Sequence, residues 1–385
     1  MKNILYLHAG AEMYGADKIL LELVCGLNKN LFHPIVVLPE RGILEKKLKE
    51  NKIETYVIPY PILRRKYFNI RGIWQYFSTY YSSCKKIENL IKWKNIDLIH
   101  VNTAAVLEGI YLKKKLETKM VWHIHEIILS PVIVGKTLNY LVGRYSDKCI
   151  AVSEAVKDNL LKSGYFKPNQ IDVIYNGVDS QRFTPSLDSD YLYKEWHIPK
   201  NAIKVGMIGR VNAWKGQNDF LKALTPLLNE FQNLYLFIIG SAFNGQEWRV
   251  DSLKKKISED KNSERIVYSK FRTDNNYIQN FFDLLILPST NPDPLPTVVL
   301  EAMASGTPVI GYKHGGITEM IRNGKDGMLA EVNNPEDLRK KVESALINNK
   351  LESYGKSARK RQKQNFSIQT FISNFEKMYT KVITS

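Results

Sequence analysis

The stretch that decides the fold is residues 284–312, LLILPSTNPDPLPTVVLEAMASGTPVIGY. It begins with an apolar run at 284–287, passes through a proline-rich turn, and enters a helical apolar pattern near Thr297. A second apolar run follows at 308–311, so the stretch predicts a buried strand, a helix and another buried strand. Such a unit is typical of a parallel sheet that carries helices on its faces.

The same alternation runs along the whole chain. Apolar runs predict seven strands in the first half, at 3–8, 34–38, 55–58, 97–101, 120–125, 148–152 and 171–175, and five after residue 200, at 203–208, 234–239, 265–268, 284–287 and 308–311. Two successive series predict an α/β protein with two Rossmann-like, doubly wound parallel sheets. We place the first domain at 1–185 and the second at 200–365. Ligands of such sheets bind beyond the carboxyl ends of the strands, so we expect the active site in a cleft where the two domains face each other.

Composition narrows the setting of the protein. Its three cysteines, Cys25, Cys84 and Cys149, are far apart in the sequence and follow no metal-ligand spacing, which suits a reducing cytoplasm. The first residues lack the long apolar core of a signal peptide, and no apolar run is long enough to span a bilayer. We therefore expect a cytoplasmic protein.

The net charge of +16 is concentrated in part at residues 60–94, where eight basic side chains and nine aromatic ones accompany a single acid. One interpretation is a helix whose aromatic side chains are core and whose lysines face water. The other is a surface that binds anionic lipid. We favour the second, which makes the protein peripheral on the inner face of the cell membrane, with Arg64, Arg65, Lys66 and Tyr67 as acceptor or membrane contacts.

Two positions in the second domain suit a bound phosphate. A helix that begins near Thr297 aims the free backbone N–H groups of its first turn, within the stretch Pro296 to Val299, at whatever lies beyond the sheet edge. Asp293 lies just before this helix and Glu301 just inside it, where carboxylates can accept hydrogen bonds from sugar and ribose hydroxyls.

A second element, GMIGRVNAWKGQNDF at 206–220, follows the first strand of the second domain. It places Arg210 and Lys215 around a turn, before a helix that begins near Gly216. Fixed cations beside helix N-terminal amides stabilise the negative charge that a departing nucleotide diphosphate develops. The pair therefore favours diphosphate binding without a metal ion.

In these residues the chain resembles the family-4 retaining glycosyltransferases, which have the two-domain GT-B fold. Their pattern is a Glu, seven residues, a second Glu followed by Ala-Met-Ala, a Gly-x-Pro-Val turn, and Gly-Gly-x-x-Glu. Asp293, Glu301-Ala302-Met303-Ala304, Gly306-Thr307-Pro308-Val309 and Gly315-Gly316-Ile317-Thr318-Glu319 match it in order. The departure is Asp293, which stands where Glu is usual and is shorter by one methylene, roughly 1.5 Å of reach.

The resemblance implies a role for each matching position. Asp293 contacts the transferred sugar, Glu301 binds the ribose of the donor, and Arg210 and Lys215 hold its diphosphate. His125, which ends the predicted strand VWHIHE, contacts the sugar. Further donor contacts are implied at Gly15, Gly240, Lys270, Phe271, Ser289, Leu295, Pro296, Thr297 and Val298.

The loop after the first predicted strand, His8 to Asp17, resembles the glycine-rich loop with which the family faces the donor phosphates and the acceptor. It is not the G-x-G-x-x-G of a dinucleotide-dependent dehydrogenase. Residues 366–385 read as a terminal helix that in GT-B proteins crosses back to the first domain. Asp188-Ser189-Asp190 has the spacing of a metal-binding D-x-D, but it lies between the domains, and we interpret it as a solvated turn.

The expected activity is retaining transfer of a hexosyl or N-acetylhexosaminyl group from a UDP- or GDP-linked sugar to a glycan or lipid-linked acceptor. The resemblance implies no metal and no cofactor beyond this donor, and it suggests bacterial surface polysaccharide synthesis, as of lipopolysaccharide or capsule. Two alternatives stay open at this point. One is a sugar-nucleotide epimerase of the same fold, and the other is a basic nucleic-acid-binding protein, which rests on the charge alone.

Overall fold

A computed structural model of the chain describes all residues except 14, 64–66, 68 and 129–130. Of residue 70 it describes the backbone alone. Arg64, Arg65 and Lys66, predicted as membrane contacts, therefore lie outside the described residues. The chain divides into two compact units, which we treat separately. Unit 1 consists of residues 1–177 and 368–385, and unit 2 of residues 178–367.

Unit 1 is built on a seven-stranded sheet in the order β3-β2-β1-β4-β5-β6-β7, with every neighbouring pair parallel. Its strands are β1 (Lys2–His8), β2 (Phe32–Leu38), β3 (Glu54–Val57), β4 (Ile96–Asn102), β5 (Lys119–Ile124), β6 (Lys148–Ala151) and β7 (Ile171–Val173). The central strands are buried along most of their length because helices cover both faces, as their near-continuous apolar runs predict.

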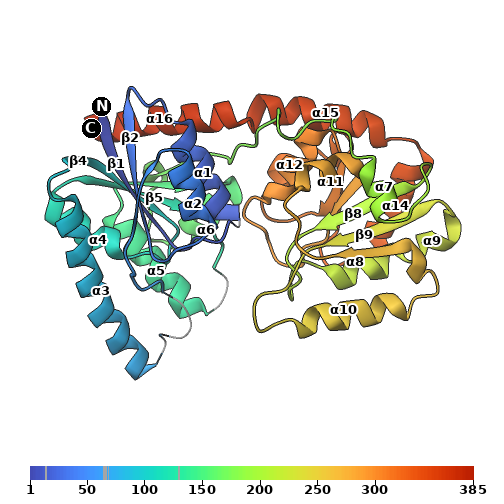
Figure 1. Ribbon diagram of the computed structural model, residues 1–385, viewed down its shortest axis with the longest axis horizontal. Helices are drawn as coiled ribbons and strands as arrows, with labels where there is room; N and C mark the ends of the chain where they lie inside the picture. Colours follow the sequence, from blue (N-terminus) through green and yellow to red (C-terminus); the bar gives the residue numbers. More distant parts are fainter. Residues whose placement is uncertain (14, 64–66, 68, 129–130) are drawn as a thin grey trace. The chain divides into compact units, whose positions relative to one another are not determined.

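The helices of unit 1 are α1 (Gly15–Gly26), α2 (Ile43–Glu50), α3 (Ile70–Ile91), α4 (Glu108–Leu116), α5 (Val132–Tyr145), α6 (Glu154–Lys162) and, from the end of the chain, α16 (Ile368–Thr384), with a 3₁₀ turn at Pro168–Gln170. The helix α16 (Figure 1) packs beside α1 and β4. Its side chains Phe371, Phe375 and Tyr379 are buried in the core of this unit. Its side chains make the terminal helix part of the first sheet's core.

Unit 2 carries a six-stranded sheet in the order β10-β9-β8-β11-β12-β13, again parallel throughout. Its strands are β8 (Ile203–Ile208), β9 (Leu234–Ile239), β10 (Ile266–Ser269), β11 (Leu284–Leu287), β12 (Val309–Tyr312) and β13 (Gly327–Ala330). Its helices are α7 (Tyr191–Glu195), α8 (Gln217–Leu224), α9 (Leu227–Glu230), α10 (Trp248–Ser258), α11 (Asn275–Phe281), α12 (Thr297–Ser305), α13 (Ile317–Met320), α14 (Pro335–Ile347) and α15 (Leu351–Asn365), with a 3₁₀ turn at Ser263–Arg265.

The predicted fold class, two Rossmann-like parallel sheets of an α/β protein, is confirmed. The sequence analysis missed β13, because this edge strand has four residues and begins at Gly327, whose φ of 153° is in the region that favours glycine. Unit 2 also begins earlier than the predicted second domain. Residues 178–183 pack on α15, where Gln362 Nε2 donates to Val178 O at 2.9 Å and Arg359 Nη1 donates to Phe183 O at 3.2 Å.

Each sheet has one point where the strand order reverses. In unit 1 the reversal lies between β1 and β4, and in unit 2 between β8 and β11. The loops that leave two such strands turn to opposite faces of the sheet, which leaves a crevice at their carboxyl ends. These two switch points are therefore where each unit is built to receive a ligand.

Candidate active site

At the switch point of unit 2, the loop after β8 packs directly on the loop after β11. Thr290 N donates to Trp214 O at 2.7 Å. Gly216, at φ 82°, caps α8 where an added Cβ would lie 1.8 Å from Pro288 O, so only glycine fits there. The predicted turn that carries Lys215 is thereby packed against the loop that leads from β11 to α12.

Lys215 and Asp293 form an ion pair across these two loops, and both side chains are largely buried. The ammonium also lies 4.4 Å from the centre of the Trp214 ring, within cation–π range. From the sequence we expected separate partners for the two residues, a phosphate and a sugar. The structure brings them together and gives each the other as its partner.

The turn that carries Asp293 is held from behind by the paired glycines of the Gly-Gly-x-x-Glu motif. Gly316 N donates to Asp293 O at 2.8 Å. A Cβ at Gly315, whose φ is 62°, would lie 2.4 Å from Asp293 O, and one at Gly316 would lie 2.2 Å from Pro294 O. These glycines therefore allow two backbone segments to touch, and that contact holds the turn that carries Asp293.

The helix α12 begins where the sequence predicted and presents an uncapped N-terminus. Pro296 occupies the N-cap position and its side chain makes no capping hydrogen bond. Thr297 and Val298 are half-buried, whereas Glu301 and Leu295 are buried. The last turn of α12 is closed by Gly306 in the left-handed region, at φ 77°. Val299 N already donates to Pro296 O at 3.0 Å, so the amides of Thr297 and Val298, with the positive end of the helix dipole, make this terminus suitable for an anion.

The other residues of unit 2 that were predicted to bind the donor differ in how firmly the structure holds them at this edge. Gly240, at φ 154°, approaches the loop of Arg210 so closely that a Cβ would lie 1.9 Å from Gly209 O. The Arg210 guanidinium stacks 3.6 Å from the centre of the Phe243 ring. Ser289 is buried and its hydroxyl has no partner among the described residues. Lys270 and Phe271 are exposed at the end of β10, so their predicted contacts rest on the sequence alone.

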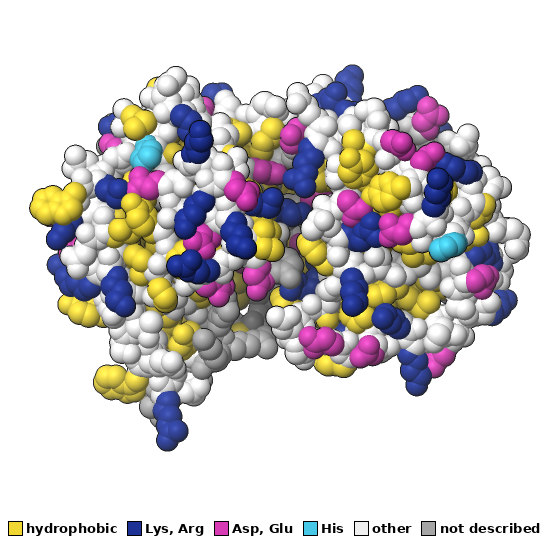
Figure 2. All heavy atoms as spheres, viewed as in Figure 1, with side chains coloured by type: hydrophobic (Ala, Val, Ile, Leu, Met, Phe, Trp, Pro, Cys, Tyr) yellow, Lys and Arg dark blue, Asp and Glu magenta, His cyan; other side chains and the backbone are white. Residues whose placement is uncertain are grey.

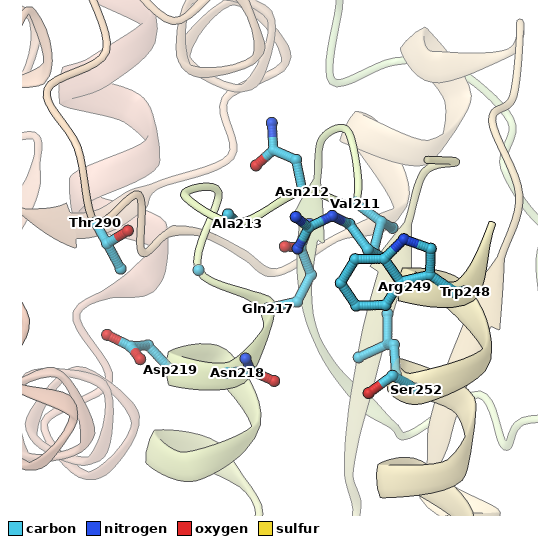
Figure 3. Close-up of a pocket in the computed structure, with 12 residues that line it drawn as sticks. Val211, Asn212, Ala213, Gln217, Asn218, Asp219, Trp248, Arg249, Ser252 and Thr290 are labelled. Atoms are coloured by element: carbon cyan, nitrogen blue, oxygen red, sulfur yellow. The ribbon is translucent and has the colours of Figure 1, made fainter. Parts of the chain in front are cut away.

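A small pocket of about 150 Å³ lies beside the loop after β8, between it and α10. Figure 3 shows Trp248 and Arg249 of α10 together with Asn212 and Gln217 of the loop and the start of α8. Neither Arg210 nor Lys215 is among the residues that line it. The pocket is thus a neighbour of the predicted diphosphate site and does not contain its cations.

At the switch point of unit 1, His8 ends β1 and pairs in register with Asn102, which ends β4. His125 follows β5, and its Nε2 lies 2.8 Å from Asn102 Oδ1. Burial, followed by the neighbouring His8 and His100, lowers the pKa of His125 to about 3, so its ring is neutral at physiological pH. Gly15, predicted as a donor contact, starts α1, and a Cβ there would meet nothing within 4 Å.

His123, the other histidine of the VWHIHE segment, is fully buried, with its ring centre 4.0 Å from that of His125 and 5.0 Å from that of Phe375. Neither of its ring nitrogens has a partner among the described residues. Burial holds the pKa of His123 well below its usual range. It is part of the core rather than of a site.

Asn102 is the residue that the sequence analysis missed. It lies between two residues of the predicted loop and strand end, His8 and His125, and contacts both. The available signal was a polar side chain at the end of the run DLIHVN, next to a switch point.

The basic and aromatic segment forms α3, whose exposed side includes Trp74, Phe77 and Tyr81, with exposed fractions of 76%, 62% and 60%. Tyr67, predicted as an acceptor or membrane contact, is buried and packs edge-to-face on Tyr76, with ring centres 5.3 Å apart. Its ring lines an apolar hollow between α3, α4 and α5 and does not project from the exposed side of α3.

Two absences concern the described residues only. Outside residues 14, 64–66, 68 and 129–130, no three His, Cys, Asp or Glu side chains lie together as a metal site would require. Over the same described ranges, none of the helices has the length and apolar character needed to cross a bilayer.

Two family models match the chain. Residues 13–182 match the family described as Glycosyltransferase Family 4, and residues 189–361 match Glycosyl transferases group 1. Each match covers one of the two Rossmann-like sheets, and together they span nearly all of residues 13–361. Both matches favour sugar transfer over an epimerase or a nucleic-acid-binding protein.

Relatives and solved structures agree with these matches. The chain is 26% identical over 325 residues to the N-acetyl-alpha-D-glucosaminyl L-malate synthase of Bacillus anthracis, covering 82% of each chain. It is 24% identical over 260 residues to the UDP-Gal:alpha-D-GlcNAc-diphosphoundecaprenol alpha-1,3-galactosyltransferase of Escherichia coli, covering 66% of each. Its fold matches that of Anabaena HepE, crystallised with UDP, at a TM-score of 0.85 and 23% identity over 99% of this chain and 100% of that one. On its two sheets and these matches, the chain belongs to the glycosyltransferases of the GT-B fold.

Proposed function

We propose that the protein transfers a sugar from a UDP-sugar to a lipid-linked acceptor, with retention of the anomeric configuration and without a metal ion. The observation that carries the proposal is the edge of unit 2, where Lys215 pairs with Asp293, just before the start of α12 in the chain. UDP is favoured over GDP because the similar Escherichia coli galactosyltransferase uses UDP-Gal and the similar Anabaena HepE was crystallised with UDP.

The donor diphosphate is placed between the α12 amides and the two basic side chains, Arg210 and Lys215. In this arrangement Lys215 exchanges partners when the donor binds. Its ammonium leaves the Asp293 carboxylate for the diphosphate, and Asp293 then accepts a hydrogen bond from a hydroxyl of the transferred sugar. A carboxylate freed in this way is correctly placed only when the diphosphate is present, which couples sugar recognition to nucleotide binding.

The transfer step follows from this placement. The acceptor hydroxyl oxygen forms a bond to the anomeric carbon on the face from which the diphosphate departs, and its proton passes to the departing phosphate oxygen. The negative charge that develops on the leaving group is held by Arg210, Lys215 and the first amides of α12. We assign no covalent sugar intermediate.

The lipid-linked acceptor is supported by a second region, in unit 1. An apolar hollow of about 510 Å³ lies between α3, α4 and α5 and is lined by apolar and aromatic side chains, including Ile73, Phe77, Leu107, Ile133 and Leu141. Beside it, Trp74, Phe77 and Ile133 expose more than half of their surface. A contiguous exposed apolar surface of this kind marks a contact with a membrane or another apolar partner.

Charge supports the same reading. Lysines and arginines on the face drawn in Figure 2 are scattered among acidic and uncharged side chains rather than gathered into one stripe. On α3, by contrast, basic residues such as Arg71, Lys85 and Lys86 accompany the exposed aromatic ones. Basic and aromatic side chains on one amphipathic helix bind anionic headgroups and the adjoining acyl chains.

The donor is tested by label transfer. The protein is incubated with radiolabelled UDP-sugars and GDP-sugars and a short-chain polyprenyl-diphosphate sugar, in buffer with EDTA. We expect label in the lipid phase with one or more UDP-sugars. Conversion of the donor without transfer, or transfer that requires added Mg²⁺ or Mn²⁺, would contradict the proposal.

The membrane face is tested by sedimentation with vesicles of phosphatidylglycerol and phosphatidylcholine. Trp74→Ser with Phe77→Ser removes two exposed rings and should reduce binding at least tenfold, because burial of each ring contributes about 1.5–3 kcal/mol. The matched control is Trp248→Ser in unit 2, also an exposed tryptophan, which should bind vesicles as the wild type does. Equal loss in both variants would remove α3 from the proposal.

A further inference from the structure

Four polar side chains at the switch point of unit 1 form one hydrogen-bonded chain. Asp17 Oδ1 lies 2.6 Å from His8 Nε2, His8 Nδ1 lies 2.9 Å from Asn102 Nδ2, and Asn102 Oδ1 lies 2.8 Å from His125 Nε2. His8, Asn102 and Asp17 are buried. The chain joins the start of α1 to the ends of β1 and β4 and to the residue after β5.

The hydrogen bonds of this series run in one direction, because Asp17 at one end can only accept a hydrogen. An ionised carboxylate such as Asp17 has no proton to donate, so His8 Nε2 carries the hydrogen. In the neutral His8 ring, Nδ1 is then an acceptor and receives a hydrogen from the Asn102 amide nitrogen. The amide oxygen therefore faces His125, and it can only accept, so His125 donates from Nε2. Each link fixes the next, and His125 is left with an unprotonated Nδ1.

The competing arrangement is a doubly protonated His8. Its Nδ1–H would donate to the backbone oxygen of Asn102, at 3.3 Å, while facing the amide nitrogen at 2.9 Å as a second donor. In the structure the Asn102 amide nitrogen faces His8 and its oxygen faces His125, which is the orientation that an unprotonated Nδ1 on His8 requires, and this orientation gives the hydrogen bonds a single direction.

The backbone beside Asn102 is held in an unusual conformation. Thr103 has φ 120°, which a β-branched residue rarely adopts. Its N–H donates to His123 O at 3.0 Å, and its carbonyl accepts from Trp122 Nε1 at 2.7 Å. Strain of this kind persists where the surroundings over-determine it, and it occurs most often beside functional groups. Here it fixes the end of β4 that presents Asn102.

We propose that Asp17, His8 and Asn102 are positioning residues, which hold His125 as the neutral Nε2–H tautomer so that Nδ1 accepts a hydrogen bond from a hydroxyl of the transferred sugar. Among the described residues Nδ1 of His125 has no hydrogen-bond partner. The inference rests on the proposed function, and it makes His125 an acceptor that orients the sugar. A histidine held in this way does not supply a proton to the leaving group.

The tautomer can be measured directly. Long-range ¹H–¹⁵N correlation spectra of protein labelled at histidine nitrogens distinguish Nε2–H from Nδ1–H, and His125→Gln assigns the signal. At neutral pH we expect a single Nε2–H form for His125. An Nδ1–H form, an equal mixture or an imidazolium in the wild type would overturn the proposal.

Substitutions in the hydrogen-bonded series distinguish its effect on the His125 tautomer from the effect of burial alone. Asn102→Leu removes both links, so His125 should become a mixture of tautomers. Asn102→Asp keeps an acceptor for His125, which should stay Nε2–H. Asp17→Asn replaces the fixed acceptor by a group that can also donate, so it too should give a mixture at His125, three links away. The control Asn275→Ala removes a buried amide in unit 2 and should leave the His125 signal unchanged.

Kinetics give an independent readout. For Asn102→Leu we expect kcat/KM for the donor sugar to fall roughly tenfold, as for the loss of one oriented hydrogen bond. The Kd for free UDP should stay the same, because the diphosphate contacts lie in unit 2, and Asn102→Asp should recover most of the loss. If Asn102→Leu is misfolded, the Asp17→Asn spectrum decides.

Failure of the inference and failure of the proposed function look different. A wild type that transfers sugar while His125 is not Nε2–H overturns the inference and leaves the function in place. A wild type that shows no reaction with any nucleotide sugar overturns the function. The same holds for variants, because loss of transfer in Asn102→Leu with an unchanged His125 tautomer contradicts the positioning role alone.

Discussion

The two switch points occupy the same place in two sheets of similar topology, but they handle polar groups in opposite ways. In unit 2 the edge is charged, with Lys215 paired to Asp293 beside an uncapped helix start. In unit 1 the edge holds a neutral His125, at the end of a chain that begins at Asp17. The comparison teaches that one type of sheet can present either a cation that binds an anion or a neutral side chain that accepts a hydrogen bond. The side chains at the ends of the strands decide which.

The largest expected effect comes from removing the cation of unit 2. Lys215→Ala should reduce transfer by about 10²–10³-fold, as for loss of one group that stabilises developing negative charge. The control Lys255→Ala removes an exposed lysine from α10 and should leave initial rates unchanged. Both are measured as label transferred at saturating donor. Near wild-type activity in Lys215→Ala would mean that the charged edge is not the diphosphate site.

Acidification should lower the stability of unit 1 before that of unit 2. Burial, as the largest cause, lowers the pKa of His100 to about 3 and also lowers that of His123 and His125. Below pH 6.5 the unfolded chain therefore takes up protons that the folded unit 1 refuses, so unit 1 loses stability as pH falls toward 5. Two acids with raised pKa, Glu108 at about 8 and Glu126, work the other way but are outnumbered.

In unit 2 two acids have lowered pKa values, in contrast to Glu108 and Glu126 of unit 1. The Arg272 guanidinium lowers the pKa of Asp274 to about 2, and Arg322 lowers that of Asp326, so their contributions are lost only as pH falls below about 4. Hydrogen exchange with mass spectrometry, corrected for intrinsic rates, should show protection falling in unit 1 peptides first between pH 6.5 and 5. Earlier loss in unit 2 would contradict this difference.

The partner exchange at Lys215 gives a smaller effect with a distinctive sign. Asp293→Asn removes the carboxylate that competes with the diphosphate, so UDP should bind up to about fivefold more tightly, the worth of a modest ion pair. Transfer should fall at the same time, because the amide replaces a sugar contact. Calorimetry measures the first and label transfer the second, with Asp251→Asn on α10 as the control. Weaker UDP binding in Asp293→Asn would show that the pair does not exchange.

The smallest effect is expected at His123. Because both of its ring nitrogens are buried without partners, His123→Phe should leave the free energy of unfolding unchanged or raise it by about 1 kcal/mol. His100→Phe is the matched control, since His100 Nδ1 lies 2.7 Å from Tyr379 OH and that bond would be lost. Urea unfolding should rank His100→Phe below His123→Phe. The reverse order would mean that His123 has a polar role.

The two sheet edges differ in how well the sequence predicted them, because one is built from local sequence motifs and the other from contacts between strands. In unit 2 the donors and acids are close in sequence to helix starts, so Lys215, Asp293 and Thr297 could be placed from local patterns. The ion pair between Lys215 and Asp293 could not, because it joins two loops 78 residues apart. In unit 1 the chain depends on the register that sets His8 beside Asn102, which only the strand order determines.

Two further details have the same origin. Tyr67 was predicted as an acceptor or membrane contact, but its burial on Tyr76, at the wall of the apolar hollow, follows only from the tertiary packing of α3. The strand β13 was too short for its periodicity to be read. Local pattern therefore specifies the elements and the charged motifs, whereas burial and cross-strand partners come from the assembled sheet.

The central claim is that the start of α12 and Lys215 grip the donor diphosphate. The most direct test follows backbone amide shifts while UDP is titrated into the full chain in the presence of EDTA. The account predicts the largest shifts at Thr297, Val298 and Lys215, with smaller ones at Asn218 and Trp248, which line the neighbouring pocket. Shifts centred on that pocket, or binding that appears only after a divalent metal ion is added, would contradict it.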